Sequence, residues 1–280
     1  MLRLVEEHHG GSNRRFAVLL ADGAMVEAVL YRGDTLCVST QVGCAVGCPF
    51  CASGARGFGR NLSLEELMEQ VDAVRRRGAR LERVTASGVG EPLHNPALPA
   101  FIEACRQQRL PVSVTTSGGP LSRLPDLLRS FHNGVTLSVH AGSEAARARA
   151  VPRGPALGPL FQLLYREVPR LSGRRRRRLA LAYLLVADVN DGADEIDAFV
   201  ERVRPLGDLN IHLYDYNPVQ TSAHRGVGRR AYEMAYARLT GAGLRVRMSC
   251  KARLEPNGGC GTLVALKARR PAGRSRSVLG

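Results

Sequence analysis

The segment "CAVGCPFC", residues 44–51, places three cysteines within eight positions, separated first by three residues and then by two. The whole chain of 280 residues has only seven cysteines. An odd number of cysteines, with no apolar leader in "MLRLVEEHHGGSNRRF", argues against a disulfide framework and for a reducing cytoplasm. We therefore expect Cys44, Cys48 and Cys51 to have a chemical role.

Zinc is the first alternative for closely spaced cysteines. A structural zinc ion takes four ligands, usually from two paired clusters, and the sequence has no second C-x-x-C and no H-x-x-x-H. Three thiolates in one short loop suit a [4Fe-4S] cluster that leaves one iron open to an exchangeable molecule. This spacing is the signature of radical S-adenosylmethionine (SAM) enzymes, and a chance group of buried thiols is the remaining alternative.

The rest of the chain alternates short aliphatic runs with helical segments, which predicts parallel strands joined by right-handed crossovers. Residues 62–78 read as a helix with a capping box at Ser63 and Glu66. Six strands predict a partial (β/α)6 TIM-like barrel, with the functional residues at the carboxyl ends of the strands. "RRFAVLLADGAMVEAVL", residues 14–30, predicts a small N-terminal β-hairpin extension. The expected strands are 35–41, 83–87, 111–117, 134–140, 179–186 and 210–216.

Polar residues and glycines follow several of these strands. Gly90 and Glu91 come after the second strand, where a glycine lets backbone approach a ligand and a carboxylate can accept from an ammonium group. Each position also has a plainer interpretation as a turn or as a satisfied core group. Their repeated placement at one end of the barrel favours a binding site. The further candidates at strand ends are Thr115, Ser138, His140 and Asn217.

Six segments together resemble the RlmN/Cfr family of radical SAM methyltransferases, which modify adenosine carbon 2 or carbon 8 in 23S rRNA and, for some members, in tRNA. The similarity runs in the order of the family over residues 14–265 and implies a [4Fe-4S] cluster and SAM as cofactors. The segments are "TLCVSTQVGCAVGCPFCASGARGFGRNLSLEEL", "GVGEPLHNP", "LSVHA", "VND", "YNP" and "CGTL". By this resemblance the positions that contact SAM are Gly90, Glu91, Thr115, Ser138, Val139, His140 and Asn217.

The resemblance also implies roles for two cysteines outside the cluster motif. Cys260 would take a methyl group from one SAM, and a radical from a second SAM would remove hydrogen from that methyl group so that its carbon adds to adenine. Cys37 would then help to remove the ring proton and release the product by forming a disulfide with Cys260. Glu27 stands at the position of the family's proton acceptor.

Charge bears on the substrate. Forty Lys and Arg against twenty-five Asp and Glu give a net charge of +15, and much of it lies in "RRRRR", residues 174–178, and in the tail. Such runs attract RNA electrostatically, although a general arginine bias of the composition is an alternative. We expect RNA as partner, an electron donor such as flavodoxin or ferredoxin, no membrane association, a monomer and a cytoplasmic location.

The sequence therefore predicts three segments: a hairpin extension over 1–34, a radical SAM core over 35–266 and a basic, disordered tail over 267–280. We expect a short family member without the helical N-terminal domain that helps others to bind RNA. The predicted function is methyl transfer to adenosine in RNA. The alternative is the same radical methylation of a nucleoside, a natural-product intermediate or a peptide.

Overall fold

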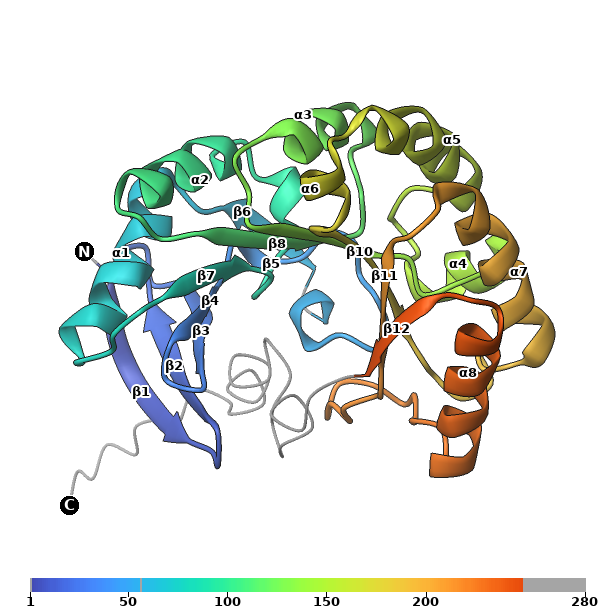
Figure 1. Ribbon diagram of the computed structural model, residues 1–280. Helices are drawn as coiled ribbons and strands as arrows, with labels where there is room; N and C mark the ends of the chain where they lie inside the picture. The colour runs from blue at the N-terminus through green and yellow to red at the C-terminus, as the bar shows by residue number, and fades with distance from the viewer. Residues whose placement is uncertain (1, 56, 249–280) are drawn as a thin grey trace, which may run out of the picture.

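One curved sheet forms the frame of the protein, and the computed structural model describes residues 2–55 and 57–248. Its ten described strands follow the order β1-β2-β3-β4-β7-β8-β9-β10-β11-β12, and helices cover the convex side (Figure 1). The strands are β1 (Arg3–His9), β2 (Asn13–Leu19), β3 (Met25–Tyr31), β4 (Thr35–Val38), β7 (Arg83–Ala86), β8 (Val112–Thr116), β9 (Gly134–Ser138), β10 (Leu179–Leu184), β11 (Asn210–Tyr214) and β12 (Arg245–Met248).

In the main sheet, each pair of adjacent strands in the order β4-β7-β8-β9-β10-β11-β12 is parallel. This arrangement confirms the predicted partial barrel, whose six expected strands correspond to β4, β7, β8, β9, β10 and β11. The additional parallel strand β12 was not predicted. It is a short strand whose side chains are mostly exposed, so its sequence, "RVRM", carries little apolar signal.

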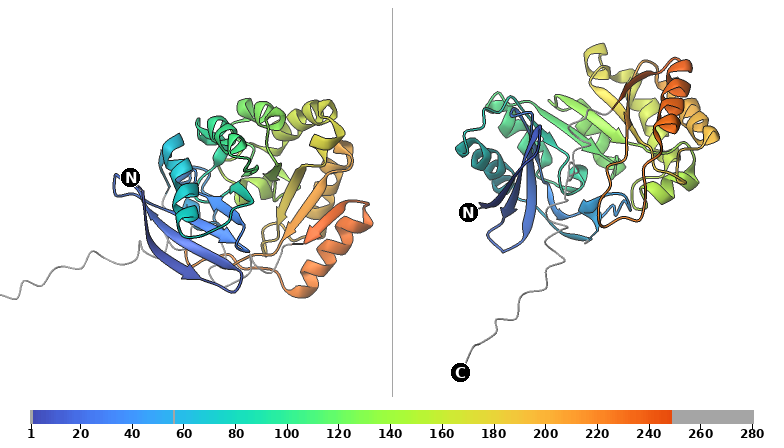
Figure 2. Two further views of the ribbon diagram at one scale, coloured as in Figure 1. Left: turned by 60° about the vertical axis from the view of Figure 1, so that its left-hand side comes forward. Right: turned by 90° about the horizontal axis from the view of Figure 1, so that it is seen from below.

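The N-terminal strands continue the same sheet. β2 and β3 form the predicted antiparallel hairpin, and β1 adds a third strand to it. β3 then pairs with β4, the first strand of the barrel, through Val29 opposite Cys37 and Tyr31 opposite Thr35. The N-terminal ribbon thus extends one side of the barrel (Figure 2).

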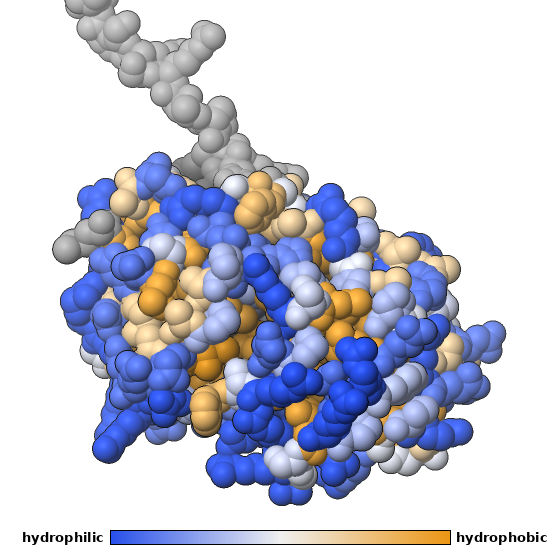
Figure 3. All heavy atoms as spheres, turned by 90° about the horizontal axis from the view of Figure 1, so that it is seen from above, coloured by the Kyte–Doolittle hydropathy of each residue, from blue (hydrophilic) through white to orange (hydrophobic). Residues whose placement is uncertain are grey.

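Amphipathic helices bury their apolar faces against the convex side of the sheet. The predicted capping box at the start of α1 is present, since Ser63 and Glu66 each bind the other's backbone N–H. Viewed from the helix side, hydrophilic residues cover most of the surface (Figure 3). The helices are α1 (Leu64–Arg76), α2 (Leu98–Gln107), α3 (Leu124–Arg129), α4 (Glu144–Ala150), α5 (Leu157–Glu167), α6 (Gly173–Arg176), α7 (Ala193–Val203) and α8 (Arg229–Gly241), with short 3-10 turns at Ala52–Gly54, Pro92–His94, Leu121–Arg123, Val168–Arg170 and Arg204–Leu206.

Two short strands hold the cysteine segment at the concave side of the barrel. β5 (Gln41–Gly43) pairs antiparallel with β6 (Phe58–Asn61), so the chain between them forms a closed loop. This loop follows β4 and lies at the carboxyl end of the parallel strands, where barrel proteins place their functional groups.

Candidate active site

Backbone hydrogen bonds fix the cysteine loop. The amide of Cys44 donates to the carbonyl of Gly57 at 2.8 Å, and the amide of Cys51 donates to the carbonyl of Cys48 at 3.0 Å. Gly47 has a φ of +66°, and a Cβ there would lie 2.2 Å from the guanidinium of Arg153. The backbone conformation and the contact with Arg153 therefore favour glycine at this point between the first two cysteines.

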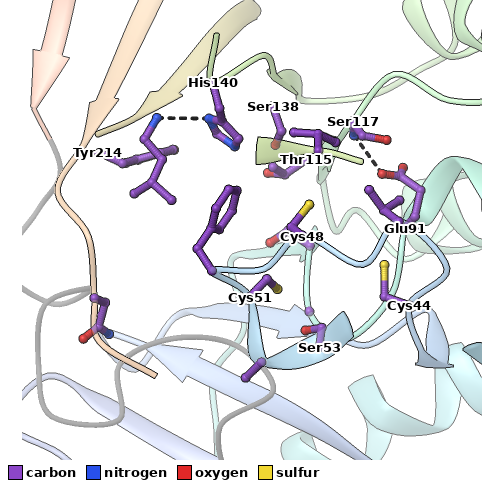
Figure 4. A pocket seen from close by; sticks show the side chains of 18 of the residues that line it. Cys44, Cys48, Cys51, Ser53, Glu91, Thr115, Ser117, Ser138, His140 and Tyr214 are labelled. Carbon is purple, nitrogen blue, oxygen red and sulfur yellow. Dashed lines mark hydrogen bonds between the residues drawn. The ribbon is translucent and has the colours of Figure 1, made fainter. Parts of the chain in front are cut away.

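Cys44, Cys48 and Cys51 line one cavity of about 280 Å³ together with residues from the ends of the parallel strands. In Figure 4 the three cysteines lie on the loop, and the side chains of the strand ends lie across the cavity from them. All but one of the predicted SAM positions line this cavity. They are Gly90, Glu91, Thr115, Ser138, His140 and Asn217.

Burial makes thiolates costly at this site in the absence of a cation. Desolvation raises the pKa of Cys44 to about 11, and it raises that of Cys48 well above the ordinary value, with the neighbouring thiols adding to both shifts. A bound metal reverses this preference, since a thiol that coordinates a metal loses its proton. Among the described residues, no group of three His, Cys, Asp or Glu side chains is close enough to bind a single metal ion. An iron–sulfur cluster fits thiols that are spread around a cavity, because its thiolate ligands bind separate irons.

Glu91 is a buried carboxylate already engaged by its own protein. It accepts from the amide of Leu93 at 3.1 Å, from the amide of Ser117 at 2.7 Å and from the hydroxyl of Thr116. A carboxylate offers about four lone-pair sites, so about one remains for a ligand in the cavity. The neighbouring Gly90 has a φ of +111°, and a Cβ there would lie 2.7 Å from Gln41.

His140 is a neutral hydrogen-bonding group. Its Nδ1 accepts from the backbone amide of Leu184 at 3.0 Å, which leaves the proton on Nε2. Burial, and then the charge of Arg147, lowers the pKa of His140 to about 3. The ring of Phe50 lies edge-on to the imidazole, with 5.6 Å between the ring centroids, and links the cysteine loop to β9.

Three of the other predicted residues, Cys37, Glu27 and Val139, are not part of the cavity lining. Cys37 is buried on β4, with its Sγ 3.3 Å from the Oγ of Ser87, which does line the cavity. Glu27 is buried on β3, where its amide donates to Ser39 Oγ at 3.2 Å. Val139 packs its side chain into the core under the helices. Cys260 lies outside the described residues.

Several residues of the site were not anticipated from the sequence. The backbone of Ser117 donates and accepts just after β8, and Tyr214 lines the cavity at the end of β11. The sequence held a weak signal for Ser117, because it is a polar residue two positions after the candidate Thr115. Arg147, whose guanidinium binds the carbonyls of the strand ends, had none, because arginines are frequent throughout this chain.

The arginine run lies at the opposite end of the barrel from the cavity. Residues 174–178 precede β10, whose far end, Leu184, lines the cavity, and six strand residues span about 20 Å. Arg175 donates to the carbonyls of Leu128 and Arg129 at the end of α3, and Arg178 donates to the carbonyl of His132 at 3.2 Å. Two of the five arginines therefore stabilise the fold.

Within residues 2–55 and 57–248, none of the helices combines the length and the apolar character that crossing a membrane demands.

Comparisons with known proteins agree with the geometry of the site. The family model of the radical SAM superfamily matches residues 38–159, which include the three loop cysteines, and proteins of this superfamily use a [4Fe-4S] cluster and SAM. A probable RNA methyltransferase of Bordetella avium is 34% identical over 95% of this chain and 76% of its own length. A probable dual-specificity RNA methyltransferase RlmN of Rhodopirellula baltica is 32% identical over 89% of this chain and 70% of its own.

A solved structure extends the comparison to the fold. The crystal structure of a radical SAM methyltransferase from Sphaerobacter thermophilus superposes with a TM-score of 0.80, at 28% identity, covering 93% of this chain and 80% of that one. Identity, coverage and fold together place the chain in the RlmN/Cfr family of radical SAM methyltransferases.

Proposed function

We propose that this radical SAM enzyme transfers a methyl group, by way of an S-methylcysteine at Cys260, to a carbon of an adenosine in RNA. The observation that carries the proposal is the one cavity in which Cys44, Cys48 and Cys51 face the ends of the parallel strands. The names of the relatives from Bordetella avium and Rhodopirellula baltica, both probable RNA methyltransferases, support RNA as the substrate.

Cys44, Cys48 and Cys51 would hold the cluster, and the residues across the cavity would hold SAM. When bound, the cluster and SAM supply the methyl group, the abstraction of a hydrogen atom from it and the exchange of single electrons with the substrate adduct. The remaining lone-pair site of Glu91 can accept from the ammonium of methionine, and the Nε2–H of His140 can donate. The backbone at Gly90 allows close approach.

Two cysteines would carry the covalent steps. The Cys260 thiolate displaces the methyl group from one SAM and becomes a thioether. After the methylene carbon has joined the base, Cys37 would help to remove the ring proton and Glu27 would be its final acceptor, which leaves Cys37 as a thiolate. The Cys37 thiolate then attacks the sulfur of Cys260, the electron pair of the carbon–sulfur bond goes to the methylene carbon, and that carbon takes up a proton.

The cycle needs two external donors. A protein of the flavodoxin or ferredoxin class would supply the single electron for the cleavage of SAM. A thiol reductant would return the disulfide between Cys37 and Cys260 to two thiols. We further propose that the enzyme acts as a cytoplasmic monomer.

Trapping of the covalent adduct tests the function. Cys37→Ala should become methylated at Cys260 and add to its substrate, but it should not release the thioether. Intact-protein mass after incubation with RNA should rise by one carbon bridge plus a nucleotide or oligonucleotide. Cys105→Ala is the control, because Cys105 lies on the outer helix α2. This variant should form methylated product at the normal rate and should accumulate no adduct.

Two results would contradict the proposal. An adduct of another mass would keep the chemistry and replace RNA with another substrate. Normal turnover by Cys260→Ala would exclude the two-cysteine mechanism itself.

A further inference from the structure

Arg147 is a buried arginine that the mechanism above does not use. It lies in α4, directly behind the cavity, and only 2% of its surface is exposed. Charged side chains are seldom buried to this extent without a partner of opposite charge.

The guanidinium group binds only backbone carbonyls. Its Nη1 donates to Ser138 at 2.6 Å and to Val139 at 2.8 Å, Nη2 donates to Ser117 at 3.0 Å, and Nε donates to Pro155 at 3.0 Å. These carbonyls belong to the ends of β8 and β9 and to the loop after α4. Arg147 thus ties together two strand ends that line the cavity.

A second contact extends this network to Glu91. The amide of Ser117 donates to the carboxylate of Glu91 at 2.7 Å, while the carbonyl of Ser117 accepts from Arg147. One peptide segment is therefore held from both sides by charged groups. Movement of Arg147 would shift the positions of Ser117, Ser138 and Glu91 relative to one another.

The positive charge has no carboxylate partner at close range. Among the ion pairs between described residues, none includes Arg147, and its four acceptors are neutral. Burial lowers the pKa of Arg147 to about 10, and the charges that oppose this change most are those of Cys48 and Glu91. The charge of Arg147 in turn opposes the rise that burial causes in the pKa of Cys48. Cys48 and Glu91, the two groups whose negative charge acts most on Arg147, both line the cavity.

We propose that Arg147 is a positioning residue that fixes the strand ends for SAM binding and whose buried charge makes the iron–sulfur cluster easier to reduce. A fixed cation favours the more negative, reduced state of a nearby cluster, because net charge and solvent exposure help to set cluster potentials. This inference rests on the cluster and SAM of the proposed function and is independent of the substrate.

Two substitutions separate the geometry from the charge. Arg147→Lys keeps the charge but replaces a planar fork with a compact ammonium that cannot reach all four carbonyls. Arg147→Gln removes the charge as well. Arg149→Gln is the matched control, since Arg149 lies on the same helix, is exposed and also donates to carbonyls, those of Asp188 and Val189.

The experiment uses the full chain, reconstituted with iron and sulfide under anaerobic conditions and without RNA. Iron content, the midpoint potential from a redox titration followed by electron paramagnetic resonance, and the SAM dissociation constant are measured for each protein. Arg147→Lys should bind SAM about tenfold more weakly, which is the equivalent of one or two lost hydrogen bonds. Its cluster should keep the midpoint potential of the parent protein. Arg147→Gln should also have a more negative potential, whereas Arg149→Gln should match the parent.

A parental potential in Arg147→Gln, or an equal negative shift in Arg149→Gln, would overturn the role of the charge. Parental SAM affinity in Arg147→Lys would overturn the positioning role. If Arg147→Gln fails to take up iron, the test rests on Arg147→Lys. Weaker SAM binding by Arg147→Lys at an unchanged midpoint potential would then support the proposal, and any other result would reject it. A parent protein that forms no cluster would instead reject the proposed function.

Discussion

Cys44, Cys48 and His140 are ionisable residues whose burial favours the neutral form. For the two thiols, this preference lasts only until a metal binds, since the metal stabilises the thiolate more than water would. For His140, neutrality is permanent at physiological pH and leaves one N–H and one acceptor. Under the proposed function, the two thiols lose their protons when the cluster binds, whereas His140 stays neutral and only forms hydrogen bonds.

Alanine at any one of Cys44, Cys48 and Cys51 should abolish cluster binding. The reconstituted parent should hold about four irons, and each variant should lose both the brown absorbance and SAM cleavage, because the remaining thiols cannot hold the cluster. Cys105→Ala is the control, since Cys105 packs against Met68 in the core under α2. A triple variant that still bound iron and cleaved SAM would show that the cluster lies elsewhere.

The buried His140 should make the apoprotein less stable in acid. Its pKa is about 3 in the folded state and about 6.5 when unfolded, so the unfolded chain binds the extra proton as the pH falls below 6.5. The contribution is complete above pH 6.5 and is lost toward pH 3, at about 1.4 kcal/mol per pH unit. Urea unfolding between pH 7 and pH 5 measures this slope.

The comparison variant is His140→Asn. Asn tolerates the φ of +54° at this position, and its oxygen can accept from Leu184 in place of Nδ1. The slope of this variant should be smaller than that of the parent by about one proton. Equal slopes would mean that His140 is protonated in the folded state.

At the scale of elements, the connection before β10 contains two kinds of arginine within one charged run. Arg175 and Arg178 are half-buried and bind carbonyls at or near the end of α3, groups that a helix end leaves without partners. The other three arginines of the run, at 174, 176 and 177, are exposed. Within this run, the exposed arginines are the ones whose guanidinium groups are most accessible to a polyanion.

Replacing the exposed arginines 174, 176 and 177 with Gln should weaken RNA binding. The logarithmic dependence of affinity on salt should flatten by up to about two units, as expected for three phosphate contacts. Filter binding at several salt concentrations measures this slope, and SAM cleavage without RNA should stay unchanged. Arg175→Gln with Arg178→Gln should instead lower the melting temperature. If the substitution of the three exposed arginines leaves RNA binding unchanged, RNA binds at the cavity end of the barrel and not at this run.

At the scale of the whole molecule, the N-terminal strands share the core of the barrel. Phe16, Val18, Val26 and Leu30 are buried in the same cluster as residues of the later helices and strands. β3 also covers the edge of β4 by hydrogen bonding. We therefore propose that the segment 1–34, although distinct in sequence, folds together with 35–266.

Deletion of residues 1–34 should prevent folding. Burial of each large apolar side chain contributes about 1.5–3 kcal/mol, and the loss of several exceeds the net stability of a typical domain. Solubility and the circular dichroism of the fragment measure the outcome. Deletion of residues 1–11, which removes the mostly exposed β1, should leave a folded protein. A fragment 35–280 that folded and bound iron would make the extension an independent unit.

The order of helices and strands, the capping box of α1 and the grouping of Cys44, Cys48 and Cys51 in one loop could be read from the sequence. Each depends on residues close together in the chain: the alternation of apolar runs, a polar residue three positions before a glutamate, or thiols within one loop. The placement of Glu91, Thr115 and other candidates at strand ends followed from the same alternation, because parallel strands end on one side of a barrel.

Tertiary structure decided what those residues can do. The lone pairs of Glu91 are largely taken by Thr116 and Ser117, and His140 is neutral because a folded barrel removes it from water. The carbonyls that gather around Arg147 come from positions 117 to 155 and meet only when two strands and a loop pack together. A sequence pattern records local geometry, whereas burial and convergence depend on segments far apart in the chain, so the charge state and hydrogen bonding of the site are fixed only by the fold.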